Sequence, residues 1–457
     1  MVFSNLVFLY LFLPAIIALY YIVPKSLKNT MLLLASLLFY AWGEPIYVFL
    51  MLGTIVVNYA CGLWLHSSPS EKGRKGVLTI AILANLGILG FYKYAAFFAT
   101  NINNLLNTHI PVPAIALPIG ISFFTFHAMS YIIDVYRRHV PPQRNVFDLT
   151  LYFSFFPQLV AGPIIRYHEV AEQFQHRTHT REKFVSGIER FLLGLSKKVL
   201  LANPLGAIAD EIFALSAGDL SSATAWIGIA AYTMQIYFDF SGYSDMAIGL
   251  AKMFGFEFQE NFRFPYISRS VSEFWRRWHI SLGSWFRDYV YIPLGGNRVV
   301  PWKAYRNLLV VWTLTGFWHG ASWTFMAWGF YYGILISLEK AGLEKRLAGW
   351  WRPLQHVYVL LAVMIGWVFF RADDFGHSMA YLGAMFGGAS AWVDGQARVL
   401  LSDNLWILLI GVVLCAPVYD RLRLSLWVKT PMLLTYLLIC TMYLVNSTYN
   451  PFIYFRF

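Results

Sequence analysis

The sequence predicts an all-α polytopic membrane protein with about eleven transmembrane helices plus re-entrant and interfacial helices. Three observations carry this prediction. Of the 457 residues, 58% are hydrophobic and only 13% are charged, whereas a soluble globular chain carries roughly 25% charged residues. The mean hydropathy is +0.54 over the whole length. Apolar runs long enough to span a bilayer recur between loops in which lysine and arginine gather.

The charge and the cysteines exclude several other classes. The formal net charge of +11 is explained by basic loops on the cytoplasmic side. No basic domain interleaved with aromatic residues is present, so we expect no nucleic-acid partner. Cys61, Cys415 and Cys440 lie in apolar runs without CxxC spacing, which favours neither a disulfide framework nor a zinc site.

The first apolar run, Leu6–Val23, lacks a basic segment before it and is followed by Lys25 and Lys28. This pattern predicts a retained first helix with its N-terminus outside the cytoplasm. The next two apolar pieces, Met31–Trp42 and Ile46–Leu65, are separated by Gly43-Glu44-Pro45. Proline resists helix continuation, so a hairpin or a sharp kink is expected there.

The following segments alternate as the charge rule requires. The basic residues of 71–75 are expected inside, Val77–Phe98 is expected to cross outward, and Thr100–Pro113 is expected to be an outer loop without lysine or arginine. Ala114–Val135 is expected to return to a basic inner segment at 137–144.

The middle of the chain is less regular. Leu149–Ile165 is apolar but contains two prolines and a glycine, which predicts a re-entrant element buried in protein. Phe184–Leu201 is amphipathic and is expected to lie in the interface. Ser221–Phe238 is expected to span the membrane and to lead into Asp239 and Asp245.

Five further apolar pieces complete the predicted spans, and Tyr381–Leu401 is ambiguous. They are Asn307–Leu314, Ala321–Leu338, Leu354–Phe370, Leu405–Val418 and Met432–Val445. No internal repeat indicates a transporter built from inverted halves.

Polar and ionisable residues concentrate in Ser268–Gly320, between apolar runs. Such residues at membrane depth are expensive and usually functional. His319 lies between Trp318 and Gly320. A buried neutral imidazole there could accept a proton, and the glycine would let a substrate approach the backbone. The alternative is a core histidine whose ring is satisfied by a neighbouring carbonyl group.

His279 ends the run Trp275-Arg-Arg-Trp-His. Trp275, Trp278 and Trp285 with Arg276 and Arg277 also fit an interfacial helix, in which tryptophan anchors and arginine snorkels. That alternative does not explain Asp288 or the glycine pair at 295–296. A metal site would need a third ligand, for which Asp239, Asp245 and Asp288 are candidates. No HExxH spacing occurs, so no metal is expected.

A carboxylate at the bilayer centre costs roughly 2.5–3.5 kcal/mol. Asp239 and Asp245 are therefore expected to be paired with a nearby lysine or arginine, to lie at an interface, or to line a wet cavity. The chain contains neither a GxSxG elbow nor a Walker loop.

Taken together, these motifs resemble the membrane-bound O-acyltransferase family, in particular the membrane subunits that serve O-acetylation of bacterial polysaccharides such as alginate. The resemblance runs over the whole chain, from the first residues to Pro451-Phe-Ile-Tyr-Phe. It is carried by Phe156–Arg166, Gln173–Thr180, Tyr237–Gly249, Glu260–Asn261, Pro265–Ser268 and Glu273–Arg298.

The resemblance implies a ring of helices around a funnel-shaped core in one membrane domain, with 268–320 as catalytic core and vestibule. It implies catalysis by His319, with His279 as the second family histidine. The residues expected to bind substrate are Asn261, Arg276, Arg277, Trp278, Asp288, Arg298 and Trp318.

The resemblance further implies acetyl transfer in the bacterial inner membrane. The acetyl donor would be a cytoplasmic thioester, acetyl-CoA or an acetylated acyl carrier protein, and no bound cofactor is expected. Besides membrane lipid, a periplasmic or membrane-anchored acetyltransferase that acts on the glycan would be the partner. Because this chain stops soon after the last shared helix, peptidoglycan, cellulose or another glycan stays open as the acceptor. A proton-coupled transporter or flippase and a non-catalytic scaffold are the alternative classes.

Overall fold

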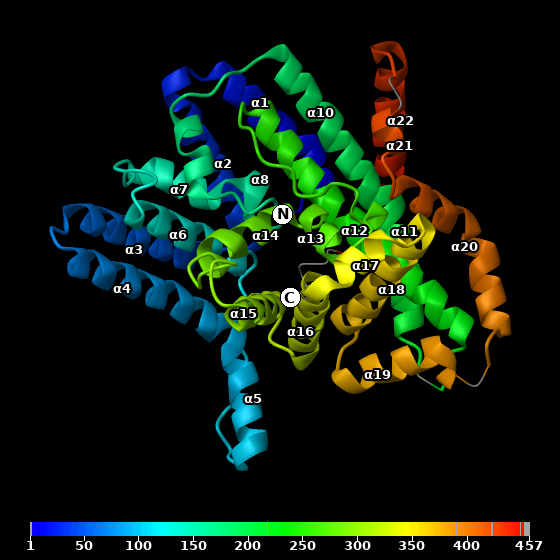
Figure 1. Ribbon diagram of the computed structural model, residues 1–457. Helices are drawn as coiled ribbons and strands as arrows, with labels where there is room; N and C mark the ends of the chain where they lie inside the picture. Colours follow the sequence, from blue (N-terminus) through cyan, green and yellow to red (C-terminus); the bar gives the residue numbers. More distant parts are fainter. Residues whose placement is uncertain (1, 217, 390, 422–423, 448, 452–457) are drawn as a thin grey trace. The chain divides into compact units, whose positions relative to one another are not determined.

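The computed structural model describes residues 2–216, 218–389, 391–421, 424–447 and 449–451. Helices, turns and loops make up this part of the chain, and no strand occurs within it. The predicted all-α class is therefore confirmed (Figure 1). Residues 452–457, which hold the end of the terminal motif, lie outside the described ranges.

The chain folds as two compact units. Unit 1 comprises Met1–Leu192 and Tyr243–Gln259, and unit 2 comprises Leu193–Gly242 and Glu260–Phe457. Two helices, α10 (Arg181–Ser196) and α12 (Ser222–Met253), each contribute residues to both units.

The remaining helices of unit 1 are as follows. They are η1 (Phe8–Phe12), α1 (Leu13–Ile22), η2 (Lys25–Leu27), α2 (Lys28–Gly43), α3 (Tyr47–Ser67), α4 (Glu71–Leu89), η3 (Gly90–Tyr94), α5 (Ala95–Leu106), α6 (Ile121–Tyr136), α7 (Val146–Ser154), α8 (Phe156–Leu159), α9 (Tyr167–Val170) and η4 (Glu172–Phe174).

Helix α6 forms the core of unit 1. It packs against α3, α4, α7 and α9, and every residue from Ile121 to Val135 is buried. A helix enclosed in this way must satisfy its polar side chains internally. Ser130 Oγ lies 3.0 Å from the Tyr152 hydroxyl, and Asp134 Oδ2 lies 2.8 Å from His168 Nδ1.

Two predicted breaks are confirmed. Helix α2 ends at Gly43 and α3 begins at Tyr47, on either side of Glu44 and Pro45. The apolar stretch Leu149–Ile165 is divided into α7, α8 and an irregular segment, and all of its residues are buried. Irregular backbone is thus enclosed by protein, as expected for a chain in lipid.

The outer-loop prediction for Thr100–Pro113 is wrong in its first half, because helix continues to Leu106. Asparagine is common in loops, which is why a loop was predicted. Here the Asn101 side chain stays within the helix, because its Nδ2 donates a hydrogen bond to the Phe97 carbonyl one turn earlier, at 2.7 Å. The predicted start of the next helix at Ala114 is also wrong. Helix α6 begins only after Gly120, whose φ of +79° lies in the left-handed region.

The boundaries predicted around Phe184–Leu201 and Ser221–Phe238 are too short. Helix α10 continues through η5 (Lys197–Ala202) into α11 (Asn203–Phe213), and this 33-residue helix is long and apolar enough to cross a membrane. Helix α12 does not stop at Asp239, because both of its aspartates are paired with basic residues on the preceding helix.

The further helices of unit 2 include those that carry His319 or flank His279. They are η6 (Pro265–Ile267), α13 (Val271–Arg277), α14 (Ile280–Phe286), η7 (Arg287–Tyr291), α15 (Pro301–His319), α16 (Trp323–Leu338), η8 (Glu339–Leu343), α17 (Glu344–Ala348), α18 (Arg352–Arg371), α19 (Phe375–Gly383), η9 (Ala384–Gly388), α20 (Gly395–Leu414), α21 (Val418–Arg421) and α22 (Leu426–Asn446).

Helices α15 and α16 form a tight antiparallel pair in unit 2 (Figure 1). Their backbones approach at Gly316 and Gly329. A Cβ atom at Gly316 would lie 2.2 Å from the Phe325 carbonyl oxygen, and one at Gly329 would lie 2.3 Å from the Trp312 carbonyl oxygen. Both positions therefore need glycine for the helices to approach this closely.

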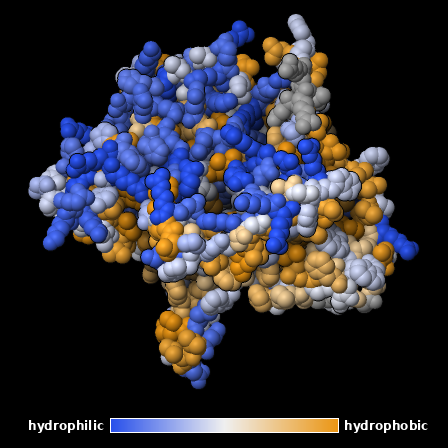
Figure 2. Space-filling model, in the orientation of Figure 1, coloured by the Kyte–Doolittle hydropathy of each residue, from blue (hydrophilic) through white to orange (hydrophobic). Residues whose placement is uncertain are grey.

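Six helical segments of the described chain are long and apolar enough to cross a membrane, so the count of eleven stays a prediction. They are Tyr47–Ser67, Glu71–Leu106, Arg181–Phe213, Arg352–Arg371, Gly395–Leu414 and Leu426–Asn446, with Phe8–Ile22 as a shorter apolar helix. Large apolar side chains cover their outer faces. On α5, for example, Phe98, Leu105 and Leu106 are exposed and form a hydrophobic surface (Figure 2).

Candidate functional site

His319 is the last residue of α15, and the chain turns directly after it. Gly320 takes an extended conformation, and the Ser322 hydroxyl then accepts a hydrogen bond from the Thr324 backbone N–H, which starts α16. A Cβ atom at Gly320 would lie 2.3 Å from the Phe325 ring. The glycine thus leaves room for an aromatic ring immediately behind the histidine.

Aromatic rings from three helices enclose the imidazole of His319. Its centroid lies 5.0 Å from Trp318 on α15, 5.2 Å from Trp328 on α16 and 5.1 Å from Phe370 on α18, and all three rings meet it edge-on. The side chain is only 8% exposed. Such packing holds the ring in one orientation and excludes most water. His319 is therefore buried as predicted, but among aromatic rings.

His279 lies between α13 and α14 and is 2% exposed. Its backbone has a φ of +46°, a left-handed conformation that non-glycine residues adopt rarely and that histidine adopts more often than most. Its Nδ1 lies 3.2 Å from Asn261 Oδ1, and its ring packs edge-on against Phe240 at 4.6 Å. Burial lowers the pKa of His279 to about 3, so the imidazole is neutral.

The Trp318 indole lies between the two histidines. Its ring centroid is 6.4 Å from that of His279 and 5.0 Å from that of His319. The two histidines are 40 positions apart in the sequence, so only the tertiary structure can bring them together. Unit 2 does so around one shared aromatic side chain.

The predicted charged residues take peripheral positions. Arg276 is exposed and lies 3.9 Å from Glu344, Arg277 pairs with Glu273 at 2.8 Å, and Asp288 accepts from Arg287 at 2.7 Å. Arg298 is exposed beside the Gly295-Gly296 turn, in which both glycines have positive φ. These residues contribute a charged surface.

The interfacial interpretation of the tryptophans is wrong for Trp278 and Trp285, which are buried. Trp278 stacks on Phe274 with centroids 5.6 Å apart and contacts Trp367 at 5.0 Å. The arginines beside it point outward because α13 is amphipathic. A short helix with one aromatic and one basic face fits an interface and a protein core equally well by sequence pattern.

The ion-pair prediction for the aspartates of α12 is confirmed. Asp239 is fully buried and lies 2.6 Å from Lys198 Nζ, and Asp245 lies 2.7 Å from Arg190. The described residues contain no group of three or more His, Cys, Asp or Glu side chains placed to hold a metal ion.

Sequence reasoning missed Trp328, Phe370 and Glu339. The two aromatic residues lie in apolar helices that look like ordinary spans, so no local signal distinguishes them. Glu339 did have a signal, since it is an acidic residue at the end of an apolar run. Its buried carboxylate accepts from the Val271 and Ser272 backbone N–H groups at 2.7 and 2.8 Å, and so fixes the start of α13.

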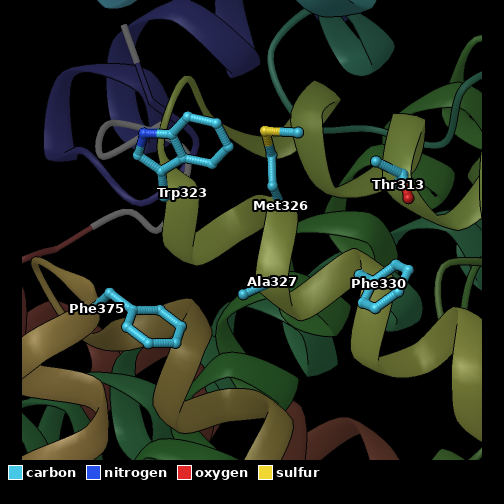
Figure 3. A pocket seen from close by; sticks show the side chains of 6 residues that line it. All are labelled: Thr313, Trp323, Met326, Ala327, Phe330 and Phe375. Carbon is cyan, nitrogen blue, oxygen red and sulfur yellow. The ribbon is translucent and has the colours of Figure 1, made fainter. Parts of the chain in front are cut away.

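A separate apolar hollow of about 340 Å³ lies on the outside of the α15–α16 pair. Its walls are Thr313, Trp323, Met326, Ala327, Phe330 and Phe375 (Figure 3). The polar atoms of these side chains are the Thr313 hydroxyl oxygen and the Trp323 indole nitrogen. This hollow suits an apolar chain and carries no titratable group.

The fold and the buried histidines fit a membrane-embedded transferase, and comparison with known proteins identifies its class. Residues 76–347 match the membrane-bound O-acyltransferase (MBOAT) family. The chain belongs to this family and is a multi-pass membrane acyltransferase.

Its similarity to individual proteins is high. It is 45% identical over 422 residues to the probable alginate O-acetylase AlgI of Azotobacter vinelandii, covering 91% of this chain and 84% of that protein. It is 34% identical to the peptidoglycan O-acetyltransferase of Helicobacter pylori, covering 100% and 98%. It is 27% identical over 283 residues to the teichoic acid D-alanyltransferase of Bacillus subtilis, covering 57% and 70%.

Proposed function

We propose that this protein is the membrane subunit of an O-acetyltransferase that moves acetyl groups from a cytoplasmic thioester across the inner membrane to an extracytoplasmic polysaccharide. Alginate is the first candidate acceptor, because the relatives of highest reported identity are named for it. The observation that carries the proposal is the enclosed imidazole of His319 beside a sharp helix break.

His319 serves as general base in this proposal. Its imidazole takes the proton of the acceptor hydroxyl while the hydroxyl oxygen attacks the thioester carbonyl carbon. The C–S bond then breaks, and the thiol leaves with the proton that the imidazole returns. General-base catalysis of this kind contributes typically about 10²–10⁴-fold, and the low-dielectric surroundings strengthen each polar contact made with the reacting groups.

The surface charges support a thioester donor with anionic groups. Arg276, Arg298 and their neighbours present positive charge that would attract the phosphates of acetyl-CoA or the acidic surface of an acyl carrier protein. A periplasmic or membrane-anchored acetyltransferase would then pass the acetyl group to the glycan. We also propose that the chain crosses the membrane about eleven times and that its N-terminus lies outside the cytoplasm.

Replacing His319 with alanine tests the proposal. We expect glycan acetylation to fall below detection, while the protein stays folded and at normal abundance in the membrane. The readout is ester-linked acetate released from the polysaccharide by mild base. His109→Ala, in an exposed segment of unit 1, is the matched control and should be active. Retained acetylation in His319→Ala would contradict the assignment and favour a non-catalytic scaffold.

Peptidoglycan is the second candidate acceptor. The Helicobacter pylori peptidoglycan O-acetyltransferase matches this chain over 98% of its own length, compared with 84% for the alginate relative. Expression of the chain in a host that lacks its own acetyltransferase separates the two. Acetylated muropeptides without acetylated alginate would favour peptidoglycan, and the reverse result would favour alginate.

A further inference from the structure

The side chain of Asn261 makes the contacts that decide which nitrogen of His279 carries the proton. Its Oδ1 lies 3.2 Å from the Ser281 backbone nitrogen and 2.9 Å from the Ser281 hydroxyl. A backbone N–H group is a donor only, so the amide atom that faces it is the oxygen and not the nitrogen. The orientation of the Asn261 amide is thereby fixed by geometry.

The same oxygen lies 3.2 Å from His279 Nδ1. An amide oxygen carries no proton, so Nδ1 must donate this hydrogen bond. The Ser281 hydroxyl, 3.5 Å from Nδ1, gives its own proton to Asn261 and can act toward Nδ1 only as an acceptor. Both neighbours therefore require a proton on Nδ1.

A neutral imidazole has one N–H group, so a proton on Nδ1 leaves Nε2 with a lone pair. The surroundings favour the neutral form. The ring's contacts include four uncharged residues, namely Phe240 on α12, Trp318 on α15, Asn261 and Ser281. Burial lowers the pKa of His279 to about 3.

Asn261 also holds the backbone of this segment. The main-chain carbonyl oxygen of Asn261 accepts a hydrogen bond from the Ile280 backbone N–H group at 3.0 Å. Ile280 directly follows His279, whose backbone is left-handed. A non-glycine residue with positive φ is found where the surrounding structure enforces it, and such positions cluster at active sites. One asparagine thus fixes the backbone, the ring orientation and the tautomer of His279.

We propose that Asn261 is a positioning residue that holds His279 as the Nδ1–H tautomer, so that Nε2 is the nitrogen that accepts a hydrogen bond during acyl transfer. The involvement of His279 in transfer rests on the proposed function, whereas the tautomer follows from the contacts alone. In this role Nε2 receives a hydrogen bond from a hydroxyl group and no covalent bond changes at His279. The ring orients the acceptor while His319 takes its proton.

Nitrogen-15 NMR of the purified protein labelled at histidine tests the tautomer directly. The His279 signals are assigned by their loss in His279→Gln. We expect the shifts of a protonated Nδ1 and an unprotonated Nε2 in the wild type, and a mixed or reversed pattern in Asn261→Ala. A proton on Nε2 in the wild type would overturn the proposal. This measurement needs no enzymatic activity, so its failure is distinct from a failure of the proposed function.

Kinetics test the consequence. In Asn261→Asp, a carboxylate of the same size next to Nδ1–H should stabilise the imidazolium form and raise the pKa of His279 by about 1–3 units. The acidic limb of the pH–rate profile should then shift to higher pH, so that Asn261→Asp needs a higher pH than the wild type to reach full activity. Asn261→Ala should lower kcat about 10–100-fold and change KM little.

Asn103→Asp is the matched control, because the Asn103 oxygen also accepts from a backbone N–H group and a hydroxyl group but faces no histidine among its hydrogen-bond partners in unit 1. Its pH–rate profile should coincide with that of the wild type. If the pH–rate profile of Asn261→Asp also coincides with those of the wild type and Asn103→Asp, the proposed role of Asn261 is overturned. If Asn261→Ala does not fold, Asn261→Asp, which preserves the shape of the side chain, decides the kinetic question.

Discussion

His319 and His279 make different kinds of contact within unit 2. Aromatic edges from α15, α16 and α18 hold His319, whereas hydrogen bonds to Asn261 hold His279. Aromatic packing restricts the orientation of a ring, whereas a hydrogen bond to an amide oxygen fixes which ring nitrogen carries the proton. This difference fits one histidine that exchanges a proton and one that orients a group.

A third histidine predicts how the stability of unit 1 depends on pH. The hydrogen bond from His168 to the buried Asp134 raises the pKa of His168 above its usual value. A raised pKa stabilises the fold most at low pH, and this contribution is lost as the pH rises through the folded-state value. The melting temperature should therefore fall as the pH rises above about 6.5, the ordinary pKa of histidine.

His168→Gln should flatten this decline, as measured by thermal unfolding in detergent at a series of pH values. His109→Gln changes a histidine in an exposed segment and should leave the decline as it is in the wild type. An equal decline in His168→Gln would show that other groups cause it.

At the scale of elements, the close contact between α15 and α16 determines where the His319 ring lies relative to Trp328. Gly329→Ala would put a methyl group 2.3 Å from the Trp312 carbonyl oxygen, and the helices would have to separate. Overpacking of this kind costs typically about 1–3 kcal/mol. We expect a lower melting temperature and reduced acetyl transfer together, because Trp328 is displaced with its helix.

Gly383→Ala on α19 is the control, since nothing lies within 4 Å of a Cβ atom there. It should be neutral or slightly stabilising, because alanine favours helix by about 1 kcal/mol over glycine. Full activity in Gly329→Ala would mean that the α15–α16 spacing does not control the position of His319.

The Lys198–Asp239 pair joins η5 to α12, and both side chains are buried, with exposures of 2% and 0%. Asp239→Asn removes the carboxylate and leaves a buried ammonium group, which should cost about 3–5 kcal/mol. The double variant Lys198→Met/Asp239→Leu removes both charges and should recover most of this loss. Asp245→Asn, in the more exposed pair with Arg190, should cost less. Thermal unfolding of the purified variants measures all three, and an unchanged melting temperature in Asp239→Asn would argue against a stabilising pair.

At the scale of the whole molecule, the alternation of basic loops predicts the orientation in the membrane. Lys72 lies in a basic segment and His109 follows a stretch without lysine or arginine, so the positive-inside rule places them on opposite sides. The three native cysteines are buried, which gives a low background for labelling.

In intact cells, a membrane-impermeant maleimide should therefore label His109→Cys, and it should label Lys72→Cys only after permeabilisation. Labelling of Lys72→Cys but not of His109→Cys in intact cells would reverse the proposed orientation. Equal labelling of both positions in intact cells would show that Glu71–Leu106 does not cross the membrane.

The sequence by itself determined the all-α membrane class, the helix break before Tyr47 and the irregular segment after α7. It also indicated His319 and His279 as candidate catalytic residues. Each depends on composition, on proline and glycine, or on polar residues in an apolar run, and all of these act locally. The sequence also indicated pairing for Asp239, because an unpaired carboxylate is costly in lipid.

Only the tertiary structure decided what surrounds each histidine. Trp328 and Phe370 come from helices whose apolar patterns are indistinguishable from lipid-facing spans, and Asn261 contacts His279 from the loop between α12 and η6. The continuation of helix through Asn101 and through Asp239 likewise depended on side-chain partners. Hydrogen bonds and packing between distant residues outweigh local propensity at these positions, and no local pattern contains them.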